Sequence, residues 1–274
     1  MSDERRLNQV QSALDAHAAA AGVDRRRWAL SVRSSLGAML RAAAPPEGFP
    51  PVAAPDDRSI EAVLESLRTR APRAFEVWRE AFEENREEYA VAERRCASLS
   101  VPSNPGAEAF AEWVQPLLRG RVLDVGCGPQ PVPVYLERHP PEWCAGIDPL
   151  PPFDEHPFVF RRALCEAIPW PDRCFESVVC ATSLDHVLDL DRSLDEVCRV
   201  LVPGGLFLLW VAFVPGSARY DLDRVTERLD RFHLFHFDRP WFYPLILRRF
   251  EIIEDWALDS QSRFLCLRPL SWSR

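Results

Sequence analysis

Residues 104–274 alternate short apolar runs with segments of helical periodicity, and this alternation restricts the possible folds more than any other feature of the chain. An open α/β sheet gives such a pattern, because helices between the strands cover the faces of the sheet. Seven runs are predicted strands, at residues 121–127, 144–148, 158–164, 175–181, 205–213, 250–257 and 263–269. Predicted helices accompany them at residues 107–118, 130–138, 191–202 and 238–248.

The last two predicted strands are separated only by the short stretch "DSQS" at residues 259–262. A parallel crossover needs a dozen or more residues, so these two strands are expected to form an antiparallel hairpin. The sequence therefore predicts an α/β fold with a seven-stranded, Rossmann-like, mostly parallel sheet that ends in an antiparallel hairpin.

Residues 1–103 differ in pattern and are expected to form an N-terminal helical extension to a domain of residues 104–274. Apolar residues recur at helical spacing over residues 3–43, and a proline-rich stretch at residues 42–57 then breaks any helix. Ser59 is the predicted N-cap of a second helical region with one proline interruption. The extension is suited to be a lid over a site, a contact in a homodimer or a docking surface for a partner protein.

Charge and composition exclude several classes of function. A net charge of -8 and a pI near 5.4 give no general attraction to phosphate backbones or anionic membranes, so a nucleic-acid substrate is not expected. No apolar run reaches membrane-spanning length and the polar start is unlike a signal peptide, so we expect a cytoplasmic protein. The eight cysteines show neither CxxC pairs nor zinc-like spacing with histidine, and no metal site is expected.

A glycine pair follows the first predicted strand of the sheet, in "RVLDVGCGPQ" at residues 121–130. Gly126 and Gly128 let the backbone turn sharply and approach a ligand, and the predicted helix at 130–138 would direct its N-terminal amides into the same crevice. Asp148 ends the next strand, where a carboxylate can accept both hydroxyls of a nucleotide ribose. A dinucleotide is disfavoured, because Pro131 stands where GxGxxG would continue.

Four collinear segments resemble a known family. They are "VLDVGCGP", "GIDP", "EAIPWPDRCFESVVC" and "LDEVCRVLVPGGLFLL", and together they span about residues 107–270. They resemble the class I S-adenosylmethionine-dependent methyltransferases, of the kind grouped with the ubiquinone and menaquinone biosynthesis methyltransferases. The resemblance implies S-adenosyl-L-methionine as methyl donor and S-adenosyl-L-homocysteine as product.

The resemblance also implies a cofactor site, residue by residue. Asp124, Gly126 and Gly128 would border the methionine part of the cofactor, and Asp148 would hold the ribose. Glu166 would lie beside the adenine. The other implied cofactor residues are Cys127 in "VLDVGCGP", Pro149 in "GIDP", and Ala181, Thr182 and Ser183 at the end of the fourth strand. Two positions depart from the pattern, since Leu164 stands where many relatives have Asp and Gln130 replaces a small residue.

A hydroxyl acceptor gains from a general base, and histidine suits that role near neutral pH. His186 follows the fourth strand and is the first candidate, with Asp185 beside it as a weaker one; a structural hydrogen bond is the competing interpretation. In residues 230–246, His236 is preferred to His233 as an acceptor-side residue, although an aromatic cluster there also fits plain packing.

The expected function is methyl transfer to a hydroxyl of a small molecule, such as a sugar, a polysaccharide precursor or another secondary metabolite. Two alternatives stay open. One is C-methylation of an activated ring or prenyl-type acceptor, and the other is a methyltransferase-like scaffold or partner subunit without catalysis. A dehydrogenase on a similar sheet fits less well, because GxGxxG is missing.

Overall fold

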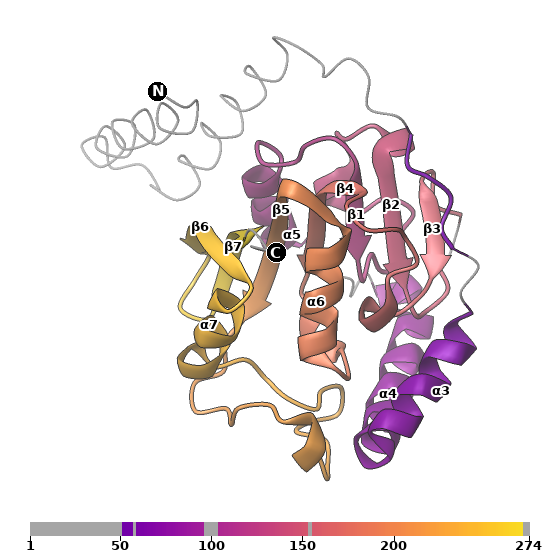
Figure 1. The fold of residues 1–274 in the computed structure, drawn as a ribbon, viewed down its shortest axis with the longest axis vertical. Helices are drawn as coiled ribbons and strands as arrows, with labels where there is room; N and C mark the ends of the chain where they lie inside the picture. The colour runs from indigo at the N-terminus through magenta and orange to yellow at the C-terminus, as the bar shows by residue number, and fades with distance from the viewer. Residues whose placement is uncertain (1–50, 57–58, 96–103, 153–154, 271–274) are drawn as a thin grey trace.

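A computed structural model describes residues 51–56, 59–95, 104–152 and 155–270 of the chain (Figure 1). Its centre is a seven-stranded sheet with the order β3-β2-β1-β4-β5-β7-β6. The strands are β1 (Val122–Val125), β2 (Cys144–Asp148), β3 (Val159–Arg162), β4 (Phe175–Ala181), β5 (Leu201–Ala212), β6 (Phe250–Ala257) and β7 (Ser262–Pro269). All seven predicted strands are confirmed.

Pairing in the sheet follows the expected directions. β1, β2, β3, β4 and β5 are parallel, whereas β7 runs antiparallel to both β5 and β6. The β6–β7 turn is closed by Asp259, whose Oδ1 accepts the amides of Gln261 and Ser262, each at 2.7 Å. The antiparallel hairpin that loop length predicts is therefore present.

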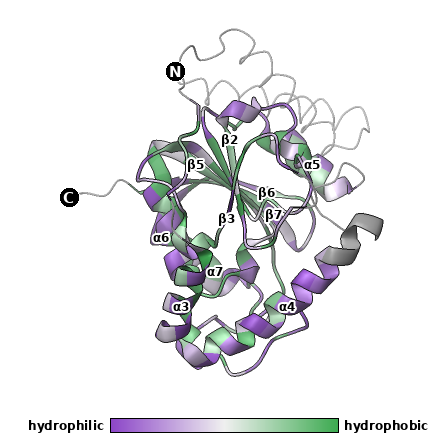
Figure 2. Ribbon diagram, turned by 90° about the vertical axis from the view of Figure 1, so that its right-hand side faces the viewer, coloured by the Kyte–Doolittle hydropathy of each residue, from purple (hydrophilic) through white to green (hydrophobic). Residues whose placement is uncertain are grey.

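Helices cover both faces of the sheet. α5 (Pro105–Val114) packs on one face, and α6 (Leu190–Val200) and α7 (Arg239–Leu247) pack on the other (Figure 1). Asn104 and Asp189 cap α5 and α6 through side-chain oxygens that accept backbone amides. Figure 2 shows the mostly hydrophobic strands at the centre, enclosed by helices that alternate between hydrophobic and hydrophilic residues. None of the helices in the described ranges is long and apolar enough to span a membrane.

The helix predicted at residues 130–138 is wrong. The structure has only the 3₁₀ turn η1 (Val134–Leu136) there, and a second one, η2 (Pro141–Trp143), before β2. Pro131 and Pro133 lack the amide protons that a helix would use, and each restricts the residue before it to extended backbone. No helix N-terminus therefore follows the glycine loop to direct amides at a ligand.

The N-terminal extension is described from residue 51, apart from residues 57–58 and 96–103, and the helices predicted at residues 3–43 lie outside the described residues. α3 (Ile60–Arg70) begins at the predicted cap, where Ser59 Oγ accepts the amide of Ala62 at 3.2 Å. α4 (Pro72–Arg95) starts at the proline that interrupts the pattern, because proline suits a first helical turn.

α3 and α4 share an apolar cluster with the parallel sheet's loops. Phe75 and Trp78 of these helices pack with Leu164, Ala167 and Leu188, which follow β3 and β4. The arrowheads of β2 and β3 point toward α4 in Figure 1, so the two helices lie at the carboxyl ends of the strands. That edge of the sheet is where ligands collect in open α/β folds.

The loops of the sheet also contain three further 3₁₀ turns. They are η3 (Cys165–Ala167), η4 (Leu184–His186) and η5 (Leu222–Arg224). η3 follows β3 and η4 follows β4, so both sit at the carboxyl ends of parallel strands and can contribute side chains to a site.

Candidate functional site

The loop after β1 contains Gly126 and Gly128 and forms the floor of the site. Both glycines have positive φ values, 73° and 72°, which residues with a Cβ rarely adopt. The amides of Gly126 and Cys127 donate to the carbonyl of Ile147 in β2, at 2.8 and 3.2 Å. The loop is therefore folded back over the carboxyl end of β2.

The segment after β4 packs directly on this glycine loop. A Cβ at position 126 would lie 2.4 Å from both Cβ and Oγ of Ser183. Ser183 is held in place, because its hydroxyl donates to the carbonyl of Val125 at 2.7 Å. Its neighbour Thr182 has φ of 59°, a left-handed conformation that is uncommon for a β-branched residue. Backbone strain of this kind is concentrated at ligand sites.

Asp148 ends β2 beside the glycine loop and is 7% exposed. Its Oδ2 accepts the amide of Gly128 at 3.0 Å and its Oδ1 accepts the amide of Leu150 at 2.8 Å. Burial raises the pKa of Asp148 to about 6, although the two amides oppose that change. Each carboxylate oxygen has two lone pairs, so one on each oxygen remains for a ligand hydroxyl.

Asp124 lies buried beneath the glycine loop. Its Oδ2 accepts the hydroxyl of Tyr135 at 3.0 Å, whereas its Oδ1 has no hydrogen-bond partner within the described ranges. Burial raises the pKa of Asp124 to about 8. An unsatisfied buried oxygen is costly, so a donor from a ligand at this position would be favourable.

Glu166 links two walls of the site. Its Oε1 accepts the amides of Leu188 and Asp189, at 2.7 and 3.1 Å, and so ties η3 to the loop after β4. Burial raises the pKa of this carboxyl. Glu166 lines the cavity described below and also supports its shape.

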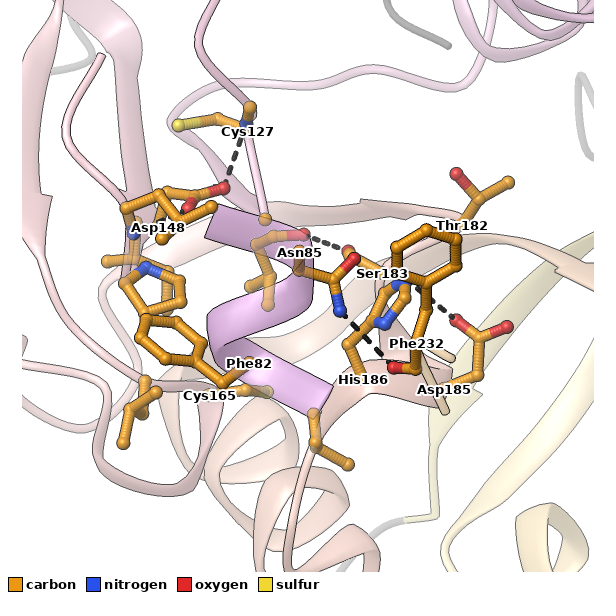
Figure 3. A pocket seen from close by; sticks show the side chains of 18 of the residues that line it. Phe82, Asn85, Cys127, Asp148, Cys165, Thr182, Ser183, Asp185, His186 and Phe232 are labelled. Carbon is orange, nitrogen blue, oxygen red and sulfur yellow. Dashed lines mark hydrogen bonds and ion pairs between the residues drawn. The ribbon is translucent and has the colours of Figure 1, made fainter. Parts of the chain in front are cut away.

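These elements enclose a cavity of about 530 Å³. Its floor is the glycine loop, its sides come from the ends of β2 and β4, and its roof comes from α4. The α4 residues that line it are Trp78, Ala81, Phe82, Asn85, Glu88 and Tyr89. In Figure 3, Cys127 and Asp148 lie on one side of α4, and Thr182, Asp185, His186 and Phe232 lie on the other. The cavity therefore joins the glycine-loop side to a second, more aromatic side.

Polar contacts hold α4 over the cavity. Trp78 Nε1 donates to the carbonyl of His186 at 2.9 Å. Asn85 Nδ2 donates to the carbonyl of Phe232 at 3.2 Å, as Figure 3 shows. An ion pair joins Glu84 to Arg231 at 2.6 Å. α4 is thus bonded to the loop after β4 and to the loop before α7, and not only packed on the sheet.

Acidic and imidazole groups gather on the second side of the cavity. Asp185, His186 and His233 all line it, and the rings of His186 and His233 stack with centroids 4.4 Å apart. His186 Nδ1 is shielded from solvent and has no hydrogen-bond partner in the part of the chain that is described. Burial lowers the pKa of His233, so that its ring is neutral near neutral pH.

The residues expected to bind a cofactor come together here. Nine of the ten line the cavity: Gly126, Cys127, Gly128, Asp148, Pro149, Glu166, Ala181, Thr182 and Ser183. The tenth, Asp124, lies beneath the loop. Of the catalytic candidates, Asp185 and His186 line the cavity, whereas His236 does not and instead contacts Asp230 at 2.8 Å.

Sequence reasoning missed part of the site. His233, the less favoured histidine of its segment, lines the cavity, and so do the aromatic residues of α4. Helical periodicity marks the apolar side of α4, as at Phe75, Trp78 and Phe82, but it does not say what that side covers. Tyr135 also lines the cavity, from the turn that was expected to be a helix.

Comparison with known proteins gives one family match. Residues 123–209 match the family model described as "Methyltransferase domain". The chain is 36% identical over 116 residues to the ubiquinone/menaquinone biosynthesis C-methyltransferase UbiE of Geobacter sulfurreducens, covering 36% of this chain and 44% of that protein. It is 28% identical over 122 residues to the uncharacterized methyltransferase YcgJ of Bacillus subtilis, covering 40% of this chain and 47% of that one. The chain spans about half the length of these curated relatives.

One of the similar solved structures covers 80% of this chain. It is the 1,6-didemethyltoxoflavin-N1-methyltransferase of Burkholderia thailandensis, crystallised with 1,6-didemethyltoxoflavin and S-adenosylhomocysteine bound. The TM-score is 0.51 at 15% sequence identity, with 80% of this chain and 93% of that chain covered. At this identity the likeness concerns the fold alone.

Proposed function

The chain carries the domain of a class I S-adenosylmethionine-dependent methyltransferase, and we propose that it transfers a methyl group to a hydroxyl of a small aromatic molecule. The observation that carries the proposal is the continuous cavity, with the glycine loop and Asp148 at one side and His186, Asp185 and His233 at the other. A methyltransferase needs a donor site and an acceptor site in one cavity, because the sulfur, the methyl group and the acceptor atom must lie in line.

The glycine-loop side fits the donor. Asp148 keeps one lone pair on each oxygen for the two ribose hydroxyls, and Asp124 beneath the loop holds the hydroxyl of Tyr135, which lines the cavity. Gly126 leaves room for Ser183 to pack against the loop, and both Gly126 and Gly128 adopt the left-handed φ that turns the loop. When bound, S-adenosylmethionine supplies a methyl group already activated on a sulfonium.

The other side fits an aromatic acceptor. Trp78 and Phe82 stack with ring centroids 5.2 Å apart and line the cavity together with Phe232. Aromatic rings from α4 and from the loop before α7 favour a flat ring as the acceptor. The roof helix α4 therefore belongs to the acceptor site, which supports the lid interpretation of the N-terminal extension.

His186 supplies the proton chemistry in this proposal. His186 lines the cavity and its side chain is 35% exposed, so an acceptor hydroxyl can approach its ring and give up a proton to it. The remaining residues exclude water and align the acceptor, since the methyl group itself needs no further activation. Asp185 lies beside His186, with 4.0 Å between a carboxylate oxygen and the ring Nε2.

C-methylation is the second candidate, and it is favoured by one observation. The Geobacter relative is a C-methyltransferase by name, although the match covers 44% of it. A phenolic ring offers both an oxygen and an activated ring carbon, so the two candidates share an acceptor class. They differ in which atom of the ring receives the methyl group.

A labelled-methyl assay tests the proposal. The full chain is incubated with methyl-labelled S-adenosylmethionine and either simple phenols and catechols or monosaccharides, and the product is located by mass spectrometry and NMR. We expect label on a phenolic oxygen. Label on a ring carbon would select the second candidate, and transfer only to sugars would overturn the aromatic acceptor. Binding of S-adenosylhomocysteine with no transfer to any acceptor class would favour a scaffold.

Gly126→Ala is expected to weaken S-adenosylhomocysteine binding at least about tenfold, because the left-handed strain costs about 1–3 kcal/mol and the new Cβ also displaces Ser183. Gly204→Ala is the matched control. Gly204 has φ of 78° but a Cβ there would meet nothing within 4 Å, so it carries the strain without the clash. Calorimetric titration and thermal unfolding of both variants measure the difference. Equal binding by the two variants would contradict the close approach of Ser183.

A further inference from the structure

Asp185, His233 and His236 form a cluster of possible metal ligands on the acceptor side of the cavity. One ligand atom from each residue lies within 4.8 Å of the other two. Asp185 lies in η4 after β4, whereas both histidines lie in the loop between β5 and α7. The fold therefore brings together, from two separate loops, three side chains of the types that bind transition metals.

Asp230 orients both imidazoles of the cluster. Its Oδ1 lies 2.9 Å from His233 Nδ1 and its Oδ2 lies 2.8 Å from His236 Nε2. A carboxylate can only accept these hydrogen bonds, so in neutral rings the other nitrogen of each histidine carries a lone pair. Metal-binding histidines commonly donate their second ring N–H to a carboxylate in this way. One carboxylate serves both rings here.

The space between the ligand atoms suits an ion better than a direct hydrogen bond. His233 Nε2 and Asp185 Oδ2 are 3.8 Å apart, beyond hydrogen-bond distance. Four-coordinate zinc with bonds of about 2.0–2.1 Å holds its ligand atoms about 3.3–3.4 Å apart. Asp185 Oδ1 is buried and has no hydrogen-bond partner among the residues described. Small movements of the three side chains would therefore place them around one ion.

We propose that Asp185, His233 and His236 bind a divalent transition-metal ion, with Asp230 as the carboxylate that orients both histidines. Two imidazoles and one carboxylate match zinc and its neighbours in the first transition row, whereas magnesium and calcium prefer oxygen ligands alone. The ion would join the loop after β4 to the loop before α7, on which α4 rests. This site goes beyond the proposed methyl transfer and does not depend on it.

Cobalt titration of the full chain without an affinity tag tests the site, after removal of metals with a chelator. One Co²⁺ per chain is expected to bind and to give the visible absorption of nitrogen and oxygen ligation. Zn²⁺ is expected to displace it and to raise the midpoint of thermal unfolding. An intense near-ultraviolet thiolate band would assign the ion to a cysteine such as Cys127 and overturn the proposal, as would wild-type protein that binds no Co²⁺.

Two substitutions locate the ion. His236→Gln and Asp185→Asn are each expected to weaken Co²⁺ binding by about 10–100-fold or more, since even the loss of an orienting partner has effects of that size. His139→Gln is the control. The His139 ring bonds to the carbonyl of Gly120 at the start of β1, whereas the cluster lies in loops that follow the carboxyl ends of strands. Unchanged affinity in both cluster variants would overturn the proposal. Titration with S-adenosylhomocysteine, which we expect His236→Gln to leave intact, reports separately on the donor site.

Discussion

Asp148→Ala is expected to reduce the affinity for S-adenosylhomocysteine by about 100-fold to 10,000-fold. Two ribose hydroxyls would each donate to a charged carboxylate oxygen, and hydrogen bonds to charged groups contribute roughly 1.5–3 kcal/mol each. About 3–6 kcal/mol corresponds to two to four powers of ten in Kd. Calorimetric titration of wild-type and variant protein, at a pH near 7.5, measures the difference directly.

The controls for this experiment separate ligand contacts from loop support. Asp148→Asn keeps the volume and one acceptor oxygen, so a smaller loss is expected than for alanine. Asp172→Ala removes an exposed carboxylate that pairs with Arg199 and should leave binding unchanged. An Asp148→Ala protein that unfolds normally and binds with wild-type affinity would refute the ribose assignment.

The pH dependence of S-adenosylhomocysteine binding is a second test of the role of Asp148. Because burial raises the pKa of Asp148 to about 6, the ligand-free protein carries a growing fraction of neutral carboxyl as the pH falls below that value. Binding that needs the carboxylate must then release a proton, so the affinity should fall by up to about tenfold per pH unit below 6.

The sheet could be predicted from the sequence because its strands are buried. Strands such as β1, β2 and β4 are recognisable in the sequence as short apolar runs. The antiparallel pairing of β6 and β7 follows from the few residues between them. Strand order does not follow from such patterns, and it comes from the structure alone. The glycine loop and Asp148 were recognisable because their chemistry depends on neighbours along a strand and its next loop.

The roof of the cavity could not be predicted, since it depends on packing between distant segments. α4 covers the carboxyl edge of the sheet through contacts of Trp78 with His186 and of Asn85 with Phe232, residues more than a hundred positions apart. The cluster of Asp185, His233 and His236 is hidden for the same reason, because no short spacing joins the two loops. Thr182 in a left-handed conformation has no sequence signal at all.

The structure also explains one departure from the family pattern. Leu164, where many relatives carry Asp, is 5% exposed and belongs to the apolar cluster that includes Phe75 and Trp78. A charged carboxylate there would be buried under α3 and α4 without a partner, at a high cost. Leucine at this position therefore accompanies the helical roof. The structure offers no comparable reason for Gln130.

His186→Ala is expected to lower kcat for an oxygen acceptor by about 100-fold to 10,000-fold, the usual contribution of a positioned general base. The affinity for S-adenosylhomocysteine should stay near that of the wild type, because His186 lies on the other side of α4 from Asp148 (Figure 3). Steady-state kinetics with separate kcat and KM values, together with calorimetry, measure both quantities. Added imidazole is expected to restore part of the rate, which a purely structural histidine would not allow.

His139→Gln provides the matched control for loss of an imidazole, since His139 lies in the β1–β2 connection and bonds to the carbonyl of Gly120. If His186→Ala lowered kcat by less than about threefold, the base assignment would fail and C-methylation would gain support, because an activated ring carbon needs less help to lose its proton. If the variant lost rate but gained nothing from imidazole, His186 would position the acceptor through its ring, which stacks on His233. The size of the loss, the donor affinity and the rescue thus separate proton transfer from acceptor alignment at one residue.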